Sequence, residues 1–350
     1  DKQVRITTTV PDPALLNRLT FLYIIDANLP SGQEPSMAGT GPYRIKPGTK
    51  PTDQKVEMVA ADNYHGATPK VRALSFGYEA DDDALLKAFQ SGKYNIVGAV
   101  SVDEAKSVKN ATEFVSSEPD VSFIAFNTVK PGPLQNKLVR EAIRYAVDPD
   151  AIGNARGNQI TPISQLIPES IPGYNPSIAP YKRDTAKAKK LLADAGYPNG
   201  LAIRFSTTED TKAVDEITKN LKEAGITLNI DRHDDFDEFI SYFTSGKAEM
   251  YSVNYASDTL DGLDIYTTTL DSANYNNPKL TALLQQAGET TDPAKRLKLL
   301  QDAGVVIDQD VAIVPLSTEN NLWLMDKNYA IQQDLPSSFI SVYFQKVRTR

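Results

Sequence analysis

Three aspartates at a spacing of three residues, Asp258, Asp261 and Asp264, are the side chains of this sequence best placed to do chemistry. They follow the segment MYSVNYA, which alternates apolar and small residues like a buried strand that ends at water. Carboxylates at the end of a strand can bind a metal ion, act as acid and base, or hold a cationic ligand. The surrounding residues distinguish these three kinds of chemistry.

A calcium loop does not fit the aspartates. The EF-hand pattern needs oxygen ligands at its first, third, fifth and twelfth positions and glycine at its sixth. Placing Gly262 sixth puts Ser257 first and Thr268 twelfth, so the match fails. Glycosidases use a pair of carboxylates, but with 45 acidic residues in the chain a close pair is near to chance. An acid/base hydrolase built on Asp258 and Asp261 is the remote alternative.

Histidine and cysteine chemistry is almost missing from the sequence. The two histidines, His65 and His233, are far apart, and neither has a second histidine at the spacing of a metal site. We expect both in turns or at the surface. The lack of cysteine removes disulfides, thiolate catalysis and cysteine-based metal sites. We therefore predict no catalytic residue, no metal site and no cofactor.

Length and charge narrow the class of protein. A chain of 350 residues predicts two or three domains. Its net charge of −8 repels phosphate, so nucleic acid is not an expected partner. No apolar run approaches the ~20 residues that a membrane helix needs. The opening segment DKQVRITTTV is polar and strand-like, unlike a signal peptide.

The elements that must position the aspartates follow a repeated order of helix, glycine and strand. The three helices end at Gly196, Gly225 and Gly246, where glycine takes up the left-handed conformation without steric cost. Three such units in succession predict an α/β sheet covered by helices. We place their strands, 201–206, 227–231 and 250–255, at the centre of that sheet.

Other elements are predicted from the same signals. Alternation over 4–10 predicts a strand, followed by a short helix over 14–22. Residues 29–42 are rich in Gly, Pro and Ser and predict a loop that crosses between domains. The remaining predicted strands are 43–45, 55–61, 73–78, 94–97, 120–128 and 311–325, and the remaining helices are 82–91, 103–109, 134–147, 278–290 and 292–308.

Five segments, taken in order, resemble one known family. They are GTGPYRI, LLKAFQSGKYNIVG, IAFNTVKPGPLQNKLVREAIRYAVDPDAI, IPGYNPSIAPYKRDTAKAKKLLADAGYPNG and YNNPKLTALLQQAGETTDPAKRLKLLQ. Together they resemble the extracellular solute-binding proteins of peptide/nickel-type ABC importers, family 5, over nearly the whole chain from Thr40 onward. This resemblance implies an α/β, bilobal, periplasmic-binding-protein-like fold of type II, cluster C.

The resemblance also implies a domain layout. Residues 1–37 would end a small inserted domain, 38–119 would form part of lobe I, 120–318 would form lobe II, and 319–350 would return to lobe I. Family members carry a further portion ahead of the position that matches Asp1, so we expect an N-terminally truncated chain. The signal peptide and lipid-anchor cysteine of the family would lie in that portion. The expected location is extracytoplasmic, in the periplasm or on the outer membrane face, with a lipid anchor in the full-length parent.

The resemblance gives one aspartate a role. In peptide-binding relatives the matching segment reads roughly GWxADYPDP, and Asp258 falls on its first Asp, which pairs with the α-ammonium of the ligand. The backbone of Asn254, Tyr255 and Ala256 would bond the ligand main chain like an added strand. Weaker candidates for ligand contact are Ser122 and Phe123 near the first hinge strand, and Asn321 and Trp323 near the second.

The other two aspartates keep ordinary structural roles. We expect Asp261 to cap the helix toward Tyr266 and Asp264 to be a solvated acid in its first turn. Leu260 and Gly262 replace the two prolines of the family pattern, so the loop can differ and the class of ligand stays open.

The main hypothesis is a non-enzymatic substrate-binding component of an ABC importer. It would capture an oligopeptide between two lobes by hinge closure and deliver it to the permease subunits in the membrane. We expect it to be a monomer. Within the same fold, the alternatives are an opine, an oligosaccharide or a metal chelate, although two histidines and no methionine cluster argue against nickel. A different class is a surface adhesion or chaperone-like protein.

Overall fold

The computed structural model describes residues 3–22, 39–50, 52, 54–98, 100–156, 159–208, 211–257, 259–331 and 344–350. It divides into two compact units. Unit 1 contains Asp1–Asn17 and Glu118–Glu319, and unit 2 contains Arg18–Ser117 and Asn320–Arg350. The assignment of residues to an inserted domain and to two lobes stays a prediction.

Unit 1 is built on a mixed sheet with the strand order β10-β5-β9-β7-β8. β9 is antiparallel to β5 on one side and parallel to β7 on the other. β8 pairs in parallel with β7, and β6 pairs with β10 away from this order. The strands are β5 (Ala111–Phe126), β6 (Gln159–Pro162), β7 (Leu201–Thr207), β8 (Ile226–Arg232), β9 (Met250–Ala256) and β10 (Ile313–Asp326).

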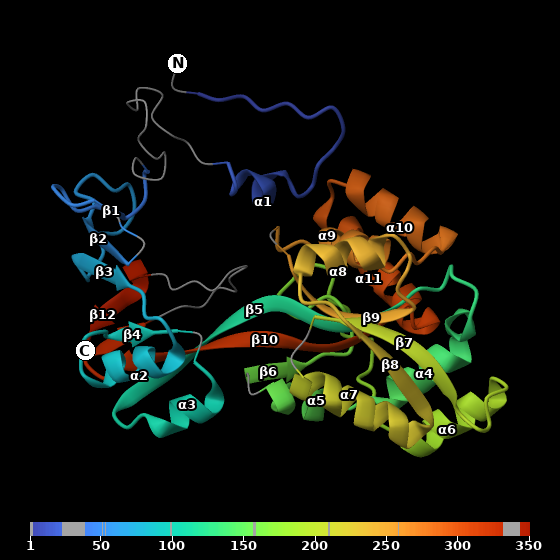
Figure 1. Ribbon diagram of the computed structural model, residues 1–350. Coiled ribbons are helices and arrows are strands. Elements are labelled where there is room, and N and C mark those ends of the chain that lie inside the picture. Colours follow the sequence, from blue (N-terminus) through green and yellow to red (C-terminus); the bar gives the residue numbers. More distant parts are fainter. Residues whose placement is uncertain are drawn as a thin grey trace. The chain divides into compact units, whose positions relative to one another are not determined.

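Helices cover both faces of this sheet because successive strand residues point to opposite sides. In β5, Phe123 and Ala125 enter one core cluster, whereas Ile124 and Phe126 enter the other. Full burial of such a side chain contributes about 1.5–3 kcal/mol. Figure 1 shows the two helical layers. They are α8 (Phe236–Thr244), α9 (Gly262–Ser272), α10 (Pro278–Glu289) and α11 (Pro293–Asp310) on one face, and α4 (Lys137–Ala146), α5 (Pro149–Arg156), α6 (Thr185–Asp194) and α7 (Thr211–Ala224) on the other.

The three predicted helix–glycine–strand units are present. Gly196, Gly225 and Gly246 have φ of 95°, 97° and 74°, the left-handed conformation that the sequence predicted. The predicted centre of the sheet is wrong in one respect, because β8 lies at the end of the strand order while β5 and β9 lie inside it. Antiparallel pairing with β5, which no local signal specifies, causes this difference.

The predicted strand at 4–10 is wrong. These residues form no strand, and Val4 is 85% exposed. A strand needs a partner, and alternation in sequence does not supply one. The helix predicted over 14–22 is the shorter α1 (Leu15–Leu19), and most of the predicted loop 29–42 lies outside the described residues.

Unit 2 contains an antiparallel sheet in the order β1-β2-β3. The apolar cluster of unit 2 lies around Phe89, Val97 and Leu324, where β4 pairs with β10. Asp81 caps α2 by accepting a bond from the Ala84 N–H at 2.7 Å. The elements are β1 (Tyr43–Ile45), β2 (Lys55–Ala60), β3 (Ala73–Gly77), α2 (Asp82–Gln90), β4 (Ile96–Val97), α3 (Val102–Ser107), β11 (Tyr329–Ile331) and β12 (Val347–Thr349).

Candidate functional site

The end of β9 brings four of the predicted site residues together. Ser122 of β5 lies opposite Asn254 of β9, and the ladder continues through Tyr255 to Ala256. Phe123, the next residue of β5, is 1% exposed and packs in the core of unit 1. Ser122 is also buried. Contact of these residues with a solute stays a prediction.

Two ladders of different length hold β9. The parallel ladder to β7 pairs Met250 and Tyr251, and the Thr207 and Ser252 hydroxyls lie 3.2 Å apart just beyond it. The antiparallel ladder to β5 runs on to Ala256. The final residues of β9 therefore continue along β5 after the β7 ladder has ended. Burial raises the pKa of Tyr251, whose hydroxyl donates to the Ser272 hydroxyl, so this side chain of β9 is buried in its neutral form.

Asp258, the predicted ligand anchor, lies outside the described residues. The residues on both sides of it are described. Ser257 is fully buried and Thr259 is 8% exposed. Their hydroxyls donate to the same oxygen, Asp264 Oδ2, at 3.4 and 3.1 Å, and the Tyr255 hydroxyl donates to it at 3.2 Å. Asp264 is half-buried, so its prediction as a solvated acid is wrong: it organises three hydroxyls at the end of β9.

Asp261 caps α9, as predicted, by accepting a bond from the Leu263 N–H at 2.9 Å. It also forms an ion pair that the sequence did not reveal. Both of its oxygens accept bonds from Arg296 of α11, at 2.7 and 2.9 Å, and both side chains are buried. The Arg296 Nε–H donates to the Ala287 carbonyl. This bidentate pair ties the loop after β9 to two helices.

The loop conformation depends on the residues that replace the prolines of the family pattern. Leu260 has φ of 51°, which the fixed negative φ of proline could not adopt. A Cβ at Gly262 would lie 2.4 Å from the Pro172 carbonyl oxygen, so only glycine allows α9 to start against that segment. The loop therefore differs from one that carries the prolines.

Signals for the residues missed by the sequence analysis are weak. The hydroxyl-rich run from Ser257 to Thr259 directly precedes a helix with an acid in its first turn, which hints at Asp264. Nothing local points to Arg296, which is distant in sequence.

The two remaining predicted residues lie on the unit 2 part of β10. Asn321 is partly buried. Trp323 stacks on Phe114, with ring centroids 5.8 Å apart and planes 12° apart, and its ring covers Gly98, where a Cβ would clash. Trp323 also lines a cavity of about 980 Å³ within unit 2, beside Tyr94 and Phe344. This volume would suit a small molecule, and Trp323 is the only predicted site residue in its wall.

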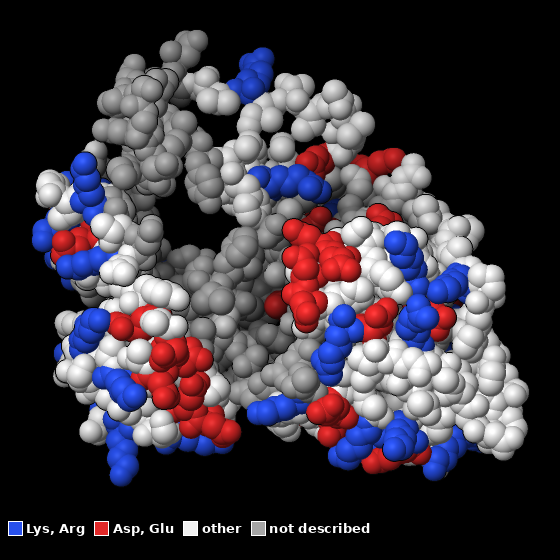
Figure 2. Space-filling view, in the orientation of Figure 1, with Lys and Arg blue, Asp and Glu red and all other residues white. Residues whose placement is uncertain are grey.

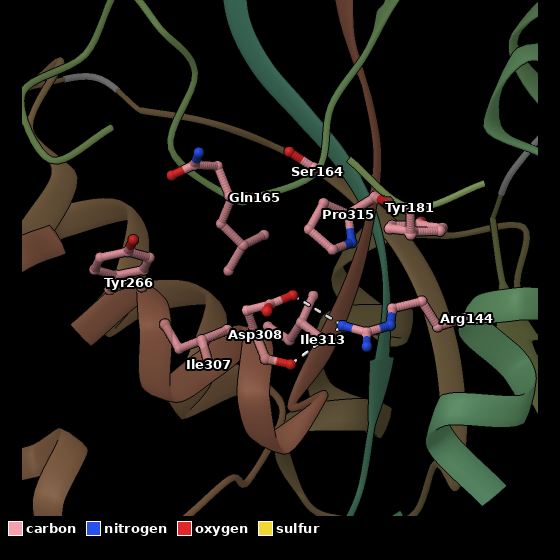
Figure 3. Close-up of a pocket in the computed structure, with 11 residues that line it drawn as sticks. Arg144, Ser164, Gln165, Tyr181, Tyr266, Ile307, Asp308, Ile313 and Pro315 are labelled. Carbon is pink, nitrogen blue, oxygen red and sulfur yellow. Dashed lines mark hydrogen bonds and ion pairs between the residues drawn. The ribbon is translucent and has the colours of Figure 1, made fainter. Parts of the chain in front are cut away.

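A second cavity, inside unit 1, is far smaller. Its volume is about 10 Å³, room for about one water molecule. Figure 3 shows Arg144 reaching Asp308 across it, with Tyr266 on the opposite side. The Arg144 N–H donates to Asp308 Oδ1 at 2.8 Å. This cavity is too small for a solute.

Surface charge is mixed. Figure 2 shows acidic and basic side chains interspersed, with acidic groups gathered over α2 and the start of α8. The first turns of these helices carry Asp82, Asp83, Asp237 and Glu238, which favour the positive end of a helix dipole. Among the described residues, no three His, Asp or Glu side chains gather to hold a metal ion.

Two curated relatives are similar to most of this chain. Heme-binding protein A of Haemophilus influenzae is 28% identical over 91% of the chain, and the glutathione-binding protein GsiB of Escherichia coli K12 is 25% identical over 83%. The chain spans only 63% and 60% of their respective lengths.

A solved structure confirms the fold. The periplasmic binding protein DppA of Helicobacter pylori, in complex with the peptide STSA, has a TM-score of 0.73 at 22% identity, covering 99% of this chain and 74% of that one. The predicted α/β, periplasmic-binding-protein-like fold class is therefore correct. In the part of the chain that the structure describes, every helix is too short or too polar to cross a lipid bilayer.

The family assignment rests on the sequence profile described as "Bacterial extracellular solute-binding proteins, family 5 Middle", which matches residues 1–277. This range covers well over half of the chain and includes β9 and the loop that follows it. The chain belongs to the family 5 bacterial extracellular solute-binding proteins.

Proposed function

We propose that this chain is the solute-capturing part of an ABC importer and that its solute is an oligopeptide with a free amino terminus. Family 5 proteins are transport binding proteins rather than enzymes. An extracytoplasmic location, a lipid anchor in the full-length protein, a monomeric state and delivery to permease subunits all belong to this proposal. So does closure of two lobes around the solute, by which binding would shift the population toward the closed form.

The observation that carries the proposal is the course of β9. Its ladder to β7 ends at Tyr251, while its ladder to β5 continues to Ala256. An extended peptide can pair its N–H and C=O groups with a strand in the manner of an added strand, whatever its side chains. A peptide running alongside the end of β9, on the β7 side, would be recognised through its main chain.

The charged end of such a peptide needs a fixed partner, and Asp258 is the second residue after the end of β9 in the sequence. Hydrogen bonds to charged groups contribute about 1.5–3 kcal/mol each. The neighbouring Asp261 is already paired with Arg296, and Asp264 already accepts three hydroxyls. Of the three aspartates, Asp258 is therefore the one that we assign to the ammonium group of the peptide.

The names of relatives are compatible with a peptide without requiring it. DppA was solved with the peptide STSA, and GsiB is named for glutathione, which also carries an α-ammonium and peptide bonds. The relative with 28% identity is named for heme, which carries neither. The solute must therefore be identified directly.

Mass spectrometry of the solute released from gently purified full-length protein tests the proposal. We expect peptides, and we expect calorimetry to show that the emptied protein binds them again. Recovery of heme, an oligosaccharide or a metal chelate in stoichiometric amount, with no binding of peptides, would contradict the proposal and favour the corresponding alternative.

A further inference from the structure

Burial raises the pKa of three tyrosines in unit 1, so their hydroxyl groups are neutral donors in the folded protein. The Tyr181 hydroxyl donates to the Pro315 carbonyl at 2.7 Å. The Tyr251 hydroxyl donates to the Ser272 hydroxyl at 3.1 Å. The third, Tyr266 of α9, is 1% exposed, and no described residue bonds its hydroxyl. A buried hydroxyl without a partner is unfavourable, so the surroundings of Tyr266 should supply one.

The Tyr266 hydroxyl lies against the middle of α11. A Cβ built at Gly304 of that helix would lie 2.6 Å from the hydroxyl oxygen. Glycine inside a helix is unfavourable relative to alanine. Gly304 nevertheless leaves beside the hydroxyl a space that an alanine side chain would fill.

Tyr266 and Gly304 both line the small cavity of unit 1, whose volume is about 10 Å³. This is room for about one water molecule, which needs two to four polar partners. Gln165 and Asp308 contribute polar side chains to the same wall. The Gln165 amide oxygen accepts a bond from the Asn175 N–H at 2.9 Å and has a second lone pair. The cavity therefore has the size and the polar wall that a single water requires.

One other buried atom at this cavity, Arg144 Nε, has no hydrogen-bond partner among the described residues. The Arg144 guanidinium nevertheless pairs with Asp308 and lies 5.6 and 5.8 Å from the ring centres of Tyr145 and Tyr181. Aromatic faces stabilise a cation at such distances. Figure 3 shows Arg144 and Tyr181 on one side of the cavity and Tyr266 on the other. Tyr266 is therefore the residue that gains most from a bound water.

We propose that the small cavity of unit 1 is a hydration site, in which one buried water accepts a hydrogen bond from the Tyr266 hydroxyl and donates to acceptors in the cavity wall. A bridging water is nearly as favourable as a direct hydrogen bond. It satisfies the polar group that α9 carries into the core and joins α9 to the residues around Gln165. This site is internal to unit 1 and does not depend on the identity of the solute.

The first test compares thermal unfolding of Tyr266→Phe with that of Tyr251→Phe in the full-length protein. If a water satisfies the Tyr266 hydroxyl, its removal deletes a bond, and the unfolding midpoint should fall by about 2 °C. Tyr251→Phe is the matched control, because its hydroxyl has a protein partner, and its midpoint should fall by a similar amount. Without a bound water, Tyr266→Phe removes an unsatisfied group, and the midpoint should stay the same or rise.

A high-resolution crystal structure of the full-length protein locates the water directly. We expect one water peak within hydrogen-bond distance of Tyr266 Oη, and no such peak at this position in Tyr266→Phe. Lack of the peak in the wild-type protein would overturn the inference. So would a Tyr266→Phe midpoint at or above that of the wild type, because the water would then not stabilise the hydroxyl. Neither result bears on the proposed function.

Discussion

The surroundings of a carboxylate set its pKa and so the pH dependence of stability. Asp310 at the end of α11 is an example in unit 1. Burial would raise its pKa, but bonds from Tyr275 and Asn277 and the charge of Arg140 outweigh burial and hold the pKa below its ordinary value. Burial, with Asp310 nearby, raises the pKa of Tyr275 to about 12. A carboxylate with a depressed pKa in the folded state contributes stability above its unfolded pKa, and this is lost as pH falls through the folded value.

We therefore predict that Tyr275→Phe lowers the free energy of unfolding near pH 7 by about 1.5–3 kcal/mol, the usual contribution of a bond to a charged group. The difference from wild type should shrink as pH falls below about 4, because the ordinary pKa of an aspartate lies near 3.9 and the stability is lost as pH falls from there through the lower pKa of folded Asp310. Urea unfolding at pH 7, 5 and 3 measures it, with the exposed Tyr78→Phe as control. A difference that stays constant down to pH 3 would contradict the assigned cause.

At this scale the sequence was informative where a residue acts on its own neighbours. Gly196 and the cap at Asp261 were predictable because glycine conformations and caps depend on local sequence. The pairing of Asp261 with Arg296 and the role of Asp264 were not. Their partners are set by how helices pack on the sheet, which spacing along the chain does not encode.

Among the elements, α4 and α11 are joined by the buried guanidinium of Arg140, in addition to the pair of Arg144 with Asp308. Arg140 of α4 donates to the carbonyl oxygens of Leu134, Gln135, Asp310 and Val311, at 2.7–3.1 Å. Two of these carbonyls lie at the C-terminus of α11, where the helix dipole favours a positive charge. Burial lowers the pKa of Arg140, partly offset by Tyr275 and Asp310.

We predict that Arg140→Met destabilises the protein by at least about 3 kcal/mol, because several buried carbonyls lose their donor. The matched control is Lys137→Met on the same helix, whose partly exposed side chain forms an ion pair with Glu141. Chemical unfolding measures both variants. A loss for Arg140→Met no larger than that for Lys137→Met would show that water replaces the guanidinium at little cost.

Helices and strands could be predicted where residues close in sequence mark their ends. The helices from α6 to α8 and the strands that follow them lie close to their predicted positions, because caps, glycines and apolar periodicity mark their ends. The first half of β5 was missed, since polar residues and Pro119 interrupt its apolar pattern. The strand expected at 4–10 failed because pairing is a tertiary property.

At the scale of the whole molecule, family membership followed from several weak segments in the right order, and it was confirmed over residues 1–277. The identity of the solute did not follow. Recognition through main-chain groups and a charged end does not depend on ligand side chains, so it leaves little trace in the sequence of the receptor.

The most direct test is calorimetry of full-length wild-type and Asp258→Asn protein with one peptide in free-amine and N-acetylated forms. The account predicts that wild type prefers the free amine by at least about tenfold, or about 1.4 kcal/mol, and that Asp258→Asn removes the preference while binding the acetylated form as before. Equal affinity of the variant and the wild type for the free-amine peptide would contradict it.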